Sequence, residues 1–224
     1  MAKPASKLKK HQPALRRLGE RVRQRLADNP AVYRVPTDDA EVWMVGGFLT
    51  GAQCKKLRDM IDGVARPSPI DEAYHDKVYR TSYSGDIDPD DPFVRNVARR
   101  IDDLIGIDGS FGEPIQGQRY MPGQEFKAHV DWFGPEYPHF DLEMRHGGQR
   151  SITTMAFLNE VEAGGTTDFV NLGLSIQPTP GVLLLWNNAD RDGVPSQATR
   201  HAGTPVEQGT KYIFTRWYRS QPWG

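Results

Sequence analysis

The second half of the chain is divided into short apolar segments by closely spaced turn residues, and this division limits the possible folds more than any other feature. From about residue 114 onward the segments show no helical period, and Gly- and Pro-containing turns separate them. The predicted strands are IQGQRYM, EFKAHVDWF, SITTMAFLNEV, LSIQP, GVLLLWNN, TRHAGTPV and KYIFTRWYR. Many short strands without helices between them predict an antiparallel sandwich or barrel such as a jelly roll.

The first half of the chain predicts helices instead. Thr50 is a suitable N-cap for a helix over residues 51–64, and Pro92 suits the first turn of a second helix that runs to about residue 107. Their apolar stripes are Cys54, Leu57, Met60, Ile61 and Val64 in the first helix, and Phe93, Val97, Ile101, Leu104 and Ile105 in the second. Residues 66–91 predict a loop with one strand near residues 78–83. Helices followed by strands predict an α+β fold in which N-terminal helices buttress one sheet.

The N-terminal segment differs from the rest in charge. Residues 1–30 predict a basic tail and an amphipathic helix, whose apolar positions are Leu15, Leu18, Val22 and Leu26. A basic amphipathic helix can contact nucleic acid or a membrane surface. The formal net charge of the whole chain is only -1, however, so a helix packed on the domain is favoured over a nucleic-acid partner. Residues 31–224 predict one domain, with helical support over residues 31–110 and the strand core over residues 111–224.

Cysteine content and hydropathy exclude several classes of protein. Cys54 is the only cysteine of the 224 residues, so no disulfide can form within the chain and a multi-cysteine zinc site is excluded. A single cysteine fits a reducing compartment, and no apolar run approaches the length needed to span a bilayer. We therefore expect a cytoplasmic protein without a membrane partner. The oligomeric state is left open.

The pattern His-x-Asp occurs twice, in FKAHVDWFGPEYPHFD. His129 and Asp131 lie in a predicted strand, where alternation places both side chains on one face. His139 and Asp141 follow GPEYP and lie in a predicted loop. Because a metal site needs ligands on a rigid element, the first pair is favoured as metal ligands. The second pair is predicted to lie beside the mouth of the pocket and to contact solvent or substrate.

Two further residues fit a metal site with a bound anion. His201, in TRHAGTPV, is an available third ligand, and two histidines with one carboxylate are typical of non-haem Fe(II) oxygenases. Zinc would more usually take further N or S ligands or activate a water in an open site. In KYIFTRWYR, Lys211 shares a face with Ile213 and Trp217, so it is predicted to point inward. A buried lysine needs an anionic partner, and no acid of this segment shares its face, so the carboxylate of a ligand is the natural candidate.

Together these motifs resemble a known family. From about Arg80 to the end, the chain is similar to the prolyl 4-hydroxylase-like branch of the Fe(II)- and 2-oxoglutarate-dependent dioxygenases. The motifs that carry the resemblance, in the family's order, are QRYMPGQEFKAHVDWF, GGQRSITTMAFLNEVEAGGTTDF, PTPGVLLLWNN and TRHAGTPVEQGTKYIFTRWYR. The resemblance implies a double-stranded β-helix, that is, a jelly-roll core, for the dioxygenase domain. It also implies Fe(II), 2-oxoglutarate and O2 as cofactors, with ascorbate as an auxiliary reductant.

The resemblance also assigns roles to individual residues. It makes His129, Asp131 and His201 the catalytic iron ligands. It makes Lys211, ten residues after His201, the partner of the distal carboxylate of 2-oxoglutarate. Tyr120 and Thr167 are implied to contact the same co-substrate, and Arg150 and Trp217 match positions on the substrate side of the pocket. The sequence departs from the family at two places. Phe126 stands where relatives often have Tyr, and residues 134–148 form a segment specific to this chain.

The substrate implied by the resemblance is a prolyl residue in a peptide or protein. A free amino acid or a small metabolite is the alternative within the same chemistry. A non-catalytic binding module that keeps the fold is an alternative of another class, and the complete set of His129, Asp131, His201 and Lys211 argues against it. A nucleic-acid demethylase or RNA-linked hydroxylase rests on the basic N-terminal segment alone.

Overall fold

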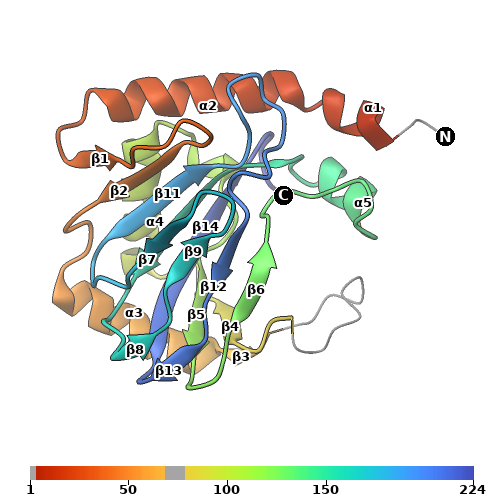
Figure 1. The fold of residues 1–224 in the computed structure, drawn as a ribbon. Coiled ribbons are helices and arrows are strands. Elements are labelled where there is room, and N and C mark those ends of the chain that lie inside the picture. Colours follow the sequence, from red (N-terminus) through yellow and green to blue (C-terminus); the bar gives the residue numbers. More distant parts are fainter. Residues whose placement is uncertain (1–3, 69–78) are drawn as a thin grey trace.

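The computed structural model describes residues 4–68 and 79–224, and it contains an eight-stranded antiparallel sheet with helices on one face and a smaller sheet on the other (Figure 1). The order of the large sheet is β1 (Val32–Arg34), β2 (Val42–Val45), β11 (Leu183–Asn187), β7 (Arg150–Phe157), β14 (Lys211–Arg219), β5 (Gln116–Tyr120), β4 (Tyr83–Asp86) and β3 (Arg66–Pro67). The smaller sheet consists of β10 (Leu174–Ile176), β9 (Thr167–Phe169), β12 (His201–Gly203) and β6 (Phe126–His129). A short pair joins β13 (Val206–Gln208) to β8 (Ala163–Gly164). The predicted combination of helices with antiparallel sheet is confirmed.

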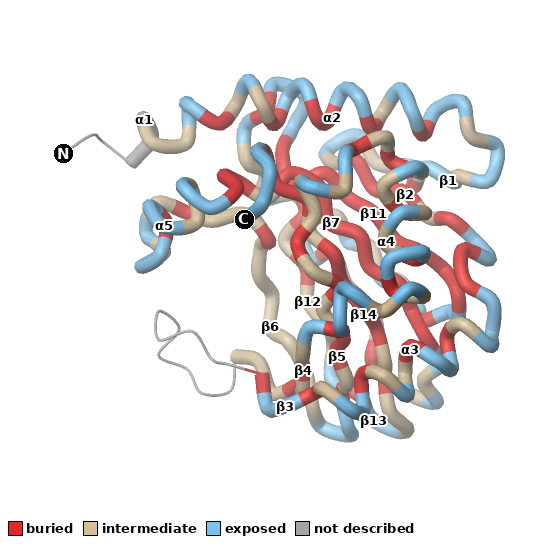
Figure 2. The backbone as a smooth tube through the Cα atoms, turned by 180° about the vertical axis from the view of Figure 1, so that it is seen from behind, coloured by how far each residue is buried: buried red, intermediate tan, exposed pale blue. Residues whose placement is uncertain are grey.

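Three helices cover the outer face of the large sheet: α2 (Gln12–Ala27), α3 (Gly51–Val64) and α4 (Pro92–Ile105). In α2 all four predicted apolar residues are buried, and buried and exposed positions alternate along the helix (Figure 2). Thr50 caps α3 with a capping box to Gln53, as the sequence predicts. Pro92 lies in the first turn of α4, and Asp91 accepts hydrogen bonds from the backbone of Phe93 and Val94.

The core has two layers because the central strands are buried on both faces. Every residue of β11 is buried, as are all residues of β7 except Arg150. On β11, Leu183 and Leu185 pack with the helices, whereas Leu184 and Trp186 pack between the sheets. This near-continuous hydrophobic burial is unusual for an antiparallel sheet, which commonly leaves one face to solvent.

Several elements differ from the sequence-based expectation. The strand expected near residues 78–83 is β4, at Tyr83–Asp86, and residue 78 lies outside the described residues. Strands β1 to β4 come from the part predicted as helical support, and they complete both edges of the large sheet. The short strand β8 lies within the EAGG segment, where a turn is expected. The three-residue strand β9 follows it. Helix α1 (Pro4–Lys9) lies in the predicted tail, and α5 (Phe140–Arg145) lies in the predicted loop.

In the part of the chain that the structure describes, none of the helices combines the length and the apolar character that crossing a bilayer requires.

The close approach of α3 to β5 depends on a glycine. A Cβ atom added to Gly117 would lie 2.3 Å from Cγ1 of Ile61, a fully buried residue of α3. We expect Gly117→Ala to destabilise the protein by about 1–3 kcal/mol, because it overpacks this contact. Gly63→Ala is the matched control, since nothing lies within 4 Å of its added Cβ and alanine favours the helix. Urea unfolding measures both variants, and an equally stable Gly117→Ala protein would contradict the packing described.

Candidate active site

The two predicted histidines lie opposite each other on neighbouring strands. His129 ends β6 and His201 begins β12, and the antiparallel register pairs the two residues directly. Their ring centroids are 4.3 Å apart. Nδ1 of each ring lies 2.9 Å from the carbonyl oxygen two residues before it, Lys127 for His129 and Thr199 for His201. A carbonyl oxygen only accepts, so Nδ1 carries the proton and Nε2 keeps its lone pair for the cavity.

Asp131 completes this cluster, but not from the strand that the sequence predicts. β6 ends at His129, and Asp131 follows in an irregular segment, so the expected alternation along one strand is wrong for this residue. Its Oδ1 lies 3.7 Å from His129 Nε2, and its Oδ2 lies 3.9 Å from His201 Nε2. Asp131 is 6% exposed. One ligand atom from each residue lies within 4.8 Å of the others.

The electrostatics of the cluster favour a neutral imidazole at His129 and an ionised carboxylate at Asp131. Burial, reinforced by the neighbouring His201, lowers the pKa of His129 to about 3. Burial raises the pKa of Asp131, but the opposing effect of His201, His129, Arg150 and the Thr153 hydrogen bond is larger, so the net pKa lies below its ordinary value. The Nε2–oxygen separations are too long for hydrogen bonds. Three acceptors held close together in this way fit a shared cation, and the donor set of two N and one O suits Fe(II).

The second His-x-Asp pair does not join the cluster. His139 precedes α5 and packs edge-on against Tyr137, with ring centroids 5.8 Å apart. Asp141 is exposed and forms an ion pair with Lys7 at 2.9 Å. Among the described residues, the metal-compatible cluster therefore contains only the first pair and His201.

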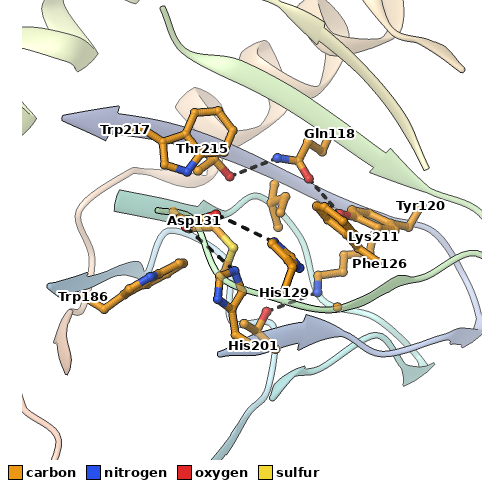
Figure 3. A pocket seen from close by; sticks show the side chains of 14 residues that line it. Gln118, Tyr120, Phe126, His129, Asp131, Trp186, His201, Lys211, Thr215 and Trp217 are labelled. Atoms are coloured by element: carbon orange, nitrogen blue, oxygen red, sulfur yellow. Dashed lines mark hydrogen bonds and ion pairs between the residues drawn. The ribbon is translucent and has the colours of Figure 1, made fainter. Parts of the chain in front are cut away.

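The cluster lines a cavity between the two sheets, which extends to Lys211 (Figure 3). Its space free of protein atoms is about 380 Å³, the open mouth included. Its lining comprises Gln118, Tyr120, Phe126, His129, Asp131, Met155, Thr167, Trp186, His201, Gly203, Lys211, Ile213, Thr215 and Trp217. The inward orientation predicted for Lys211, Ile213 and Trp217 is thus the one observed.

Lys211 is a buried cation without a carboxylate partner. It is 1% exposed, and its Nζ donates to the carbonyl of Thr166 at 3.2 Å and to Oγ1 of Thr167 at 3.3 Å. Among the described residues no ion pair is found at Nζ. Burial lowers the pKa of Lys211 to about 7, although the charge of Asp168 acts in the opposite direction. This end of the cavity therefore favours an anionic ligand.

Tyr120 and Thr167 lie at the same end of the cavity as Lys211. Tyr120 pairs with Lys211 across β5 and β14, and Lys211 Nζ lies 5.6 Å from the centre of its ring. The Tyr120 hydroxyl donates to Oε1 of Gln118 at 2.7 Å, and Gln118 Nε2 donates to Oγ1 of Thr215 at 3.1 Å (Figure 3). The three predicted co-substrate residues are thus brought together.

The two predicted substrate-side residues occupy different positions relative to the cavity. Trp217 lines the cavity, whereas Arg150 lies behind it, with its guanidinium 3.9 Å from the Trp217 ring centre. Arg150 forms a two-point ion pair with Glu113, at 2.7 and 2.8 Å. Burial lowers the pKa of Arg150, but Glu113 outweighs it and raises the net pKa. Arg150 borders a second, more open cavity with Phe133, Arg219 and Trp223.

Several lining or supporting residues were not predicted from the sequence: Gln118, Thr153, Met155, Trp186 and Asn188. The inward orientation of Gln118 was predictable, because it lies two residues before Tyr120 on one strand and so shares its face. The sequence marks Phe126 only as a departure from the family, whereas in the structure its ring stacks on that of His129, with ring centroids 3.7 Å apart.

Comparisons with known proteins agree with this site. Residues 115–219 match the family model of the 2OG-Fe(II) oxygenase superfamily. The chain is 32% identical over 200 residues to mouse prolyl 4-hydroxylase subunit alpha-1, and 34% identical over 204 residues to the rat protein. Each alignment covers 84% of this chain and 37% of the relative, so the chain spans little more than a third of the length of these relatives.

Solved structures share the fold at lower sequence identity. The viral collagen prolyl hydroxylase of Paramecium bursaria Chlorella virus-1, in complex with 2OG, has a TM-score of 0.61 at 24% identity and covers 80% of this chain and 94% of its own. A Trichoplax adhaerens prolyl hydroxylase, in complex with a peptide fragment of hypoxia inducible factor, has a TM-score of 0.59 at 19% identity and covers 98% of this chain and 94% of its own.

The two His-x-Asp pairs make opposite predictions for metal binding. We expect His129→Ala to abolish detectable binding of Mn²⁺, because it removes one of three converging ligand atoms. His139→Ala changes an exposed ring outside the cluster, and we expect it to bind Mn²⁺ as the unaltered protein does. Isothermal titration of the two variants measures the difference. The reverse result would show that the pair of His139 and Asp141 binds the metal instead of His129 and Asp131.

Proposed function

Since residues 115–219 belong to the 2OG-Fe(II) oxygenase superfamily, we propose that this chain is an Fe(II)- and 2-oxoglutarate-dependent dioxygenase that hydroxylates a prolyl residue in a peptide or protein. The observation that carries the proposal is one cavity that holds a His-Asp-His cluster and a buried Lys211. The two facing antiparallel sheets would be its double-stranded β-helix core. Residues 31–224 would form the dioxygenase domain, in which β1 to β4 extend the large sheet that carries the site, and α2 of the N-terminal segment packs on its core.

In this proposal Nε2 of His129, Nε2 of His201 and the carboxylate of Asp131 hold Fe(II). The Nδ1 hydrogen bonds of both rings fix the tautomer that leaves Nε2 free. Bound Fe(II), with 2-oxoglutarate and O2, supplies the oxidation of the substrate C–H bond. The protein provides ligand geometry, orientation and the exclusion of water.

Lys211 would bind the distal carboxylate of 2-oxoglutarate, and Thr167 already contacts its Nζ. Tyr120 would contribute its hydroxyl to the same ligand by exchanging its hydrogen bond with Gln118 for one to a carboxylate oxygen. These contacts orient the co-substrate between the lysine and the iron ligands, so that the oxidising chemistry takes place next to the substrate.

Trp186 and Trp217 border the cavity and would limit the access of water. Trp217 lines the cavity and Arg150 does not, which makes Trp217 the better candidate for substrate contact. The peptide substrate is supported by the relatives, which are named prolyl 4-hydroxylases. A free amino acid is the alternative within the same reaction.

Turnover tests the proposal directly. Purified, iron-loaded protein should convert 2-oxoglutarate to succinate, faster in the presence of a proline-containing peptide that gains one oxygen atom. We expect His129→Ala to lose this turnover and His139→Ala to retain most of it. Mass spectrometry of the peptide and quantification of succinate measure both. No succinate from the unaltered protein under any condition would rule out the enzyme.

The pKa of Lys211 predicts how the binding of 2-oxoglutarate depends on pH. Burial lowers this pKa to about 7, and a carboxylate beside Nζ raises it again. Below pH 7 the lysine is already charged, so its protonation does not affect binding. Above pH 7 binding must take up a proton, and we expect the dissociation constant to rise by up to about tenfold per pH unit.

Calorimetry of Mn²⁺-loaded protein in buffers of different ionisation enthalpy measures this uptake, which should reach about one proton at pH 8. Lys211→Arg is the control, because a guanidinium stays charged throughout this range. Equal proton uptake by Lys211→Arg would assign the effect to another group.

A further inference from the structure

Asp131 differs from the two histidines in how it is held. His129 and His201 belong to paired strands of the smaller sheet, whereas Asp131 follows the end of β6 and has no strand pairing of its own. A carboxylate in an irregular segment can rotate about its Cβ–Cγ bond unless a neighbour fixes it. The position of its two oxygens relative to the imidazoles therefore needs a separate anchor.

That anchor comes from the large sheet. Thr153 lies on β7 between Trp186 of β11 and Trp217 of β14, the two tryptophans that line the cavity. Its Oγ1 lies 2.7 Å from Oδ2 of Asp131. Asn188, directly after β11, places its Nδ2 2.9 Å from the same Oγ1. Thr153 is fully buried and Asn188 is 1% exposed.

The count of donors and acceptors fixes the direction of both hydrogen bonds. An ionised carboxylate only accepts, so the single proton of the Thr153 hydroxyl goes to Asp131. Thr153 Oγ1 must then accept from Asn188, which orients the amide with Nδ2 toward Thr153. Oδ1 of Asn188 is left buried without a hydrogen-bond partner. Burial of an amide oxygen without a hydrogen-bond partner costs free energy, so the conformation of Asn188 needs an explanation, and the donation to Thr153 supplies one.

We propose that Thr153 and Asn188 are positioning residues that hold the Asp131 carboxylate in the orientation needed to bind the metal. The inference rests on the proposed function, in that it takes His129, Asp131 and His201 as the metal ligands. Asn188 donates to Thr153, Thr153 donates to Asp131, and the carboxylate keeps both oxygens in place before a metal arrives. Outer hydrogen bonds of this kind tune metal affinity without contacting the ion.

The chain offers a matched control in the next residue. Thr154 is also fully buried on β7, but it faces the helical side, between Leu185 and Arg216. Its Oγ1 donates to the carbonyl oxygen of Arg216 at 3.0 Å. Thr153→Val and Thr154→Val therefore each remove one buried hydroxyl, from opposite faces of one strand. The Thr153 hydroxyl bonds a carboxylate, and the Thr154 hydroxyl bonds a backbone carbonyl.

The experiment measures Mn²⁺ affinity by calorimetry without co-substrate, together with the thermal stability of the metal-free proteins. We expect Thr153→Val to weaken Mn²⁺ binding about 10–100-fold. Thr153→Ser, which keeps the hydroxyl, should restore most of the affinity. Thr154→Val should bind Mn²⁺ nearly as well as the unaltered protein, although it also loses a buried hydrogen bond.

Asn188→Ala tests the hydrogen bond from Asn188 to Thr153. It also tests the proposal if Thr153→Val does not fold. Alone, Asn188→Ala should weaken Mn²⁺ binding less than Thr153→Val does. In the Thr153→Val background it should cause no further loss, because the hydrogen bonds that connect Asn188 to Asp131 are already interrupted. Unchanged affinity in both Thr153→Val and Asn188→Ala, or an equal loss in Thr154→Val, would overturn the positioning role. Absence of Mn²⁺ binding by the unaltered protein would overturn the metal site itself, which is a distinguishable result.

Discussion

The central strands of the large sheet are buried on both faces, and the rest of the structure depends on this constraint. Its central strands must present apolar side chains to the helices and to the smaller sheet alternately, as Leu185 and Trp186 do on β11. The inner face can then enclose polar groups only where they have partners or a ligand. Lys211, Thr153 and Gln118 are such groups, and all three occupy the inner face around one cavity.

The longer helices and the inward orientation of Lys211 could be predicted from the sequence because their signals are local. The periodicity of α2 and α4, the cap at Thr50 and the alternation around Lys211 depend only on nearby residues. The choice between the two His-x-Asp pairs also came from local context, since turn formers surround His139. The small strands β8 and β9 were missed because two or three residues carry too little pattern to separate a strand from a turn.

The support of the site could not be predicted, because it depends on contacts between distant segments. Thr153 and Thr154 are the same residue type in succession, and only the register of β7 with its neighbours decides which one meets Asp131. Nothing in the sequence indicates that β6 ends before Asp131. Arg150 is similar: its hydrogen bond to Glu113 joins residues 37 positions apart, and no local pattern indicates it.

The ligand cluster joins the two sheets, since its histidines belong to the smaller sheet and its carboxylate is tied to the larger one. A cation held there would act as a cross-link through the middle of the molecule. The smaller sheet has only short strands of three or four residues, so it has few backbone hydrogen bonds to resist local opening. Occupancy of the cluster would therefore govern how often β6 and β12 separate from the rest of the chain, and amide hydrogen exchange in these two strands would report that occupancy.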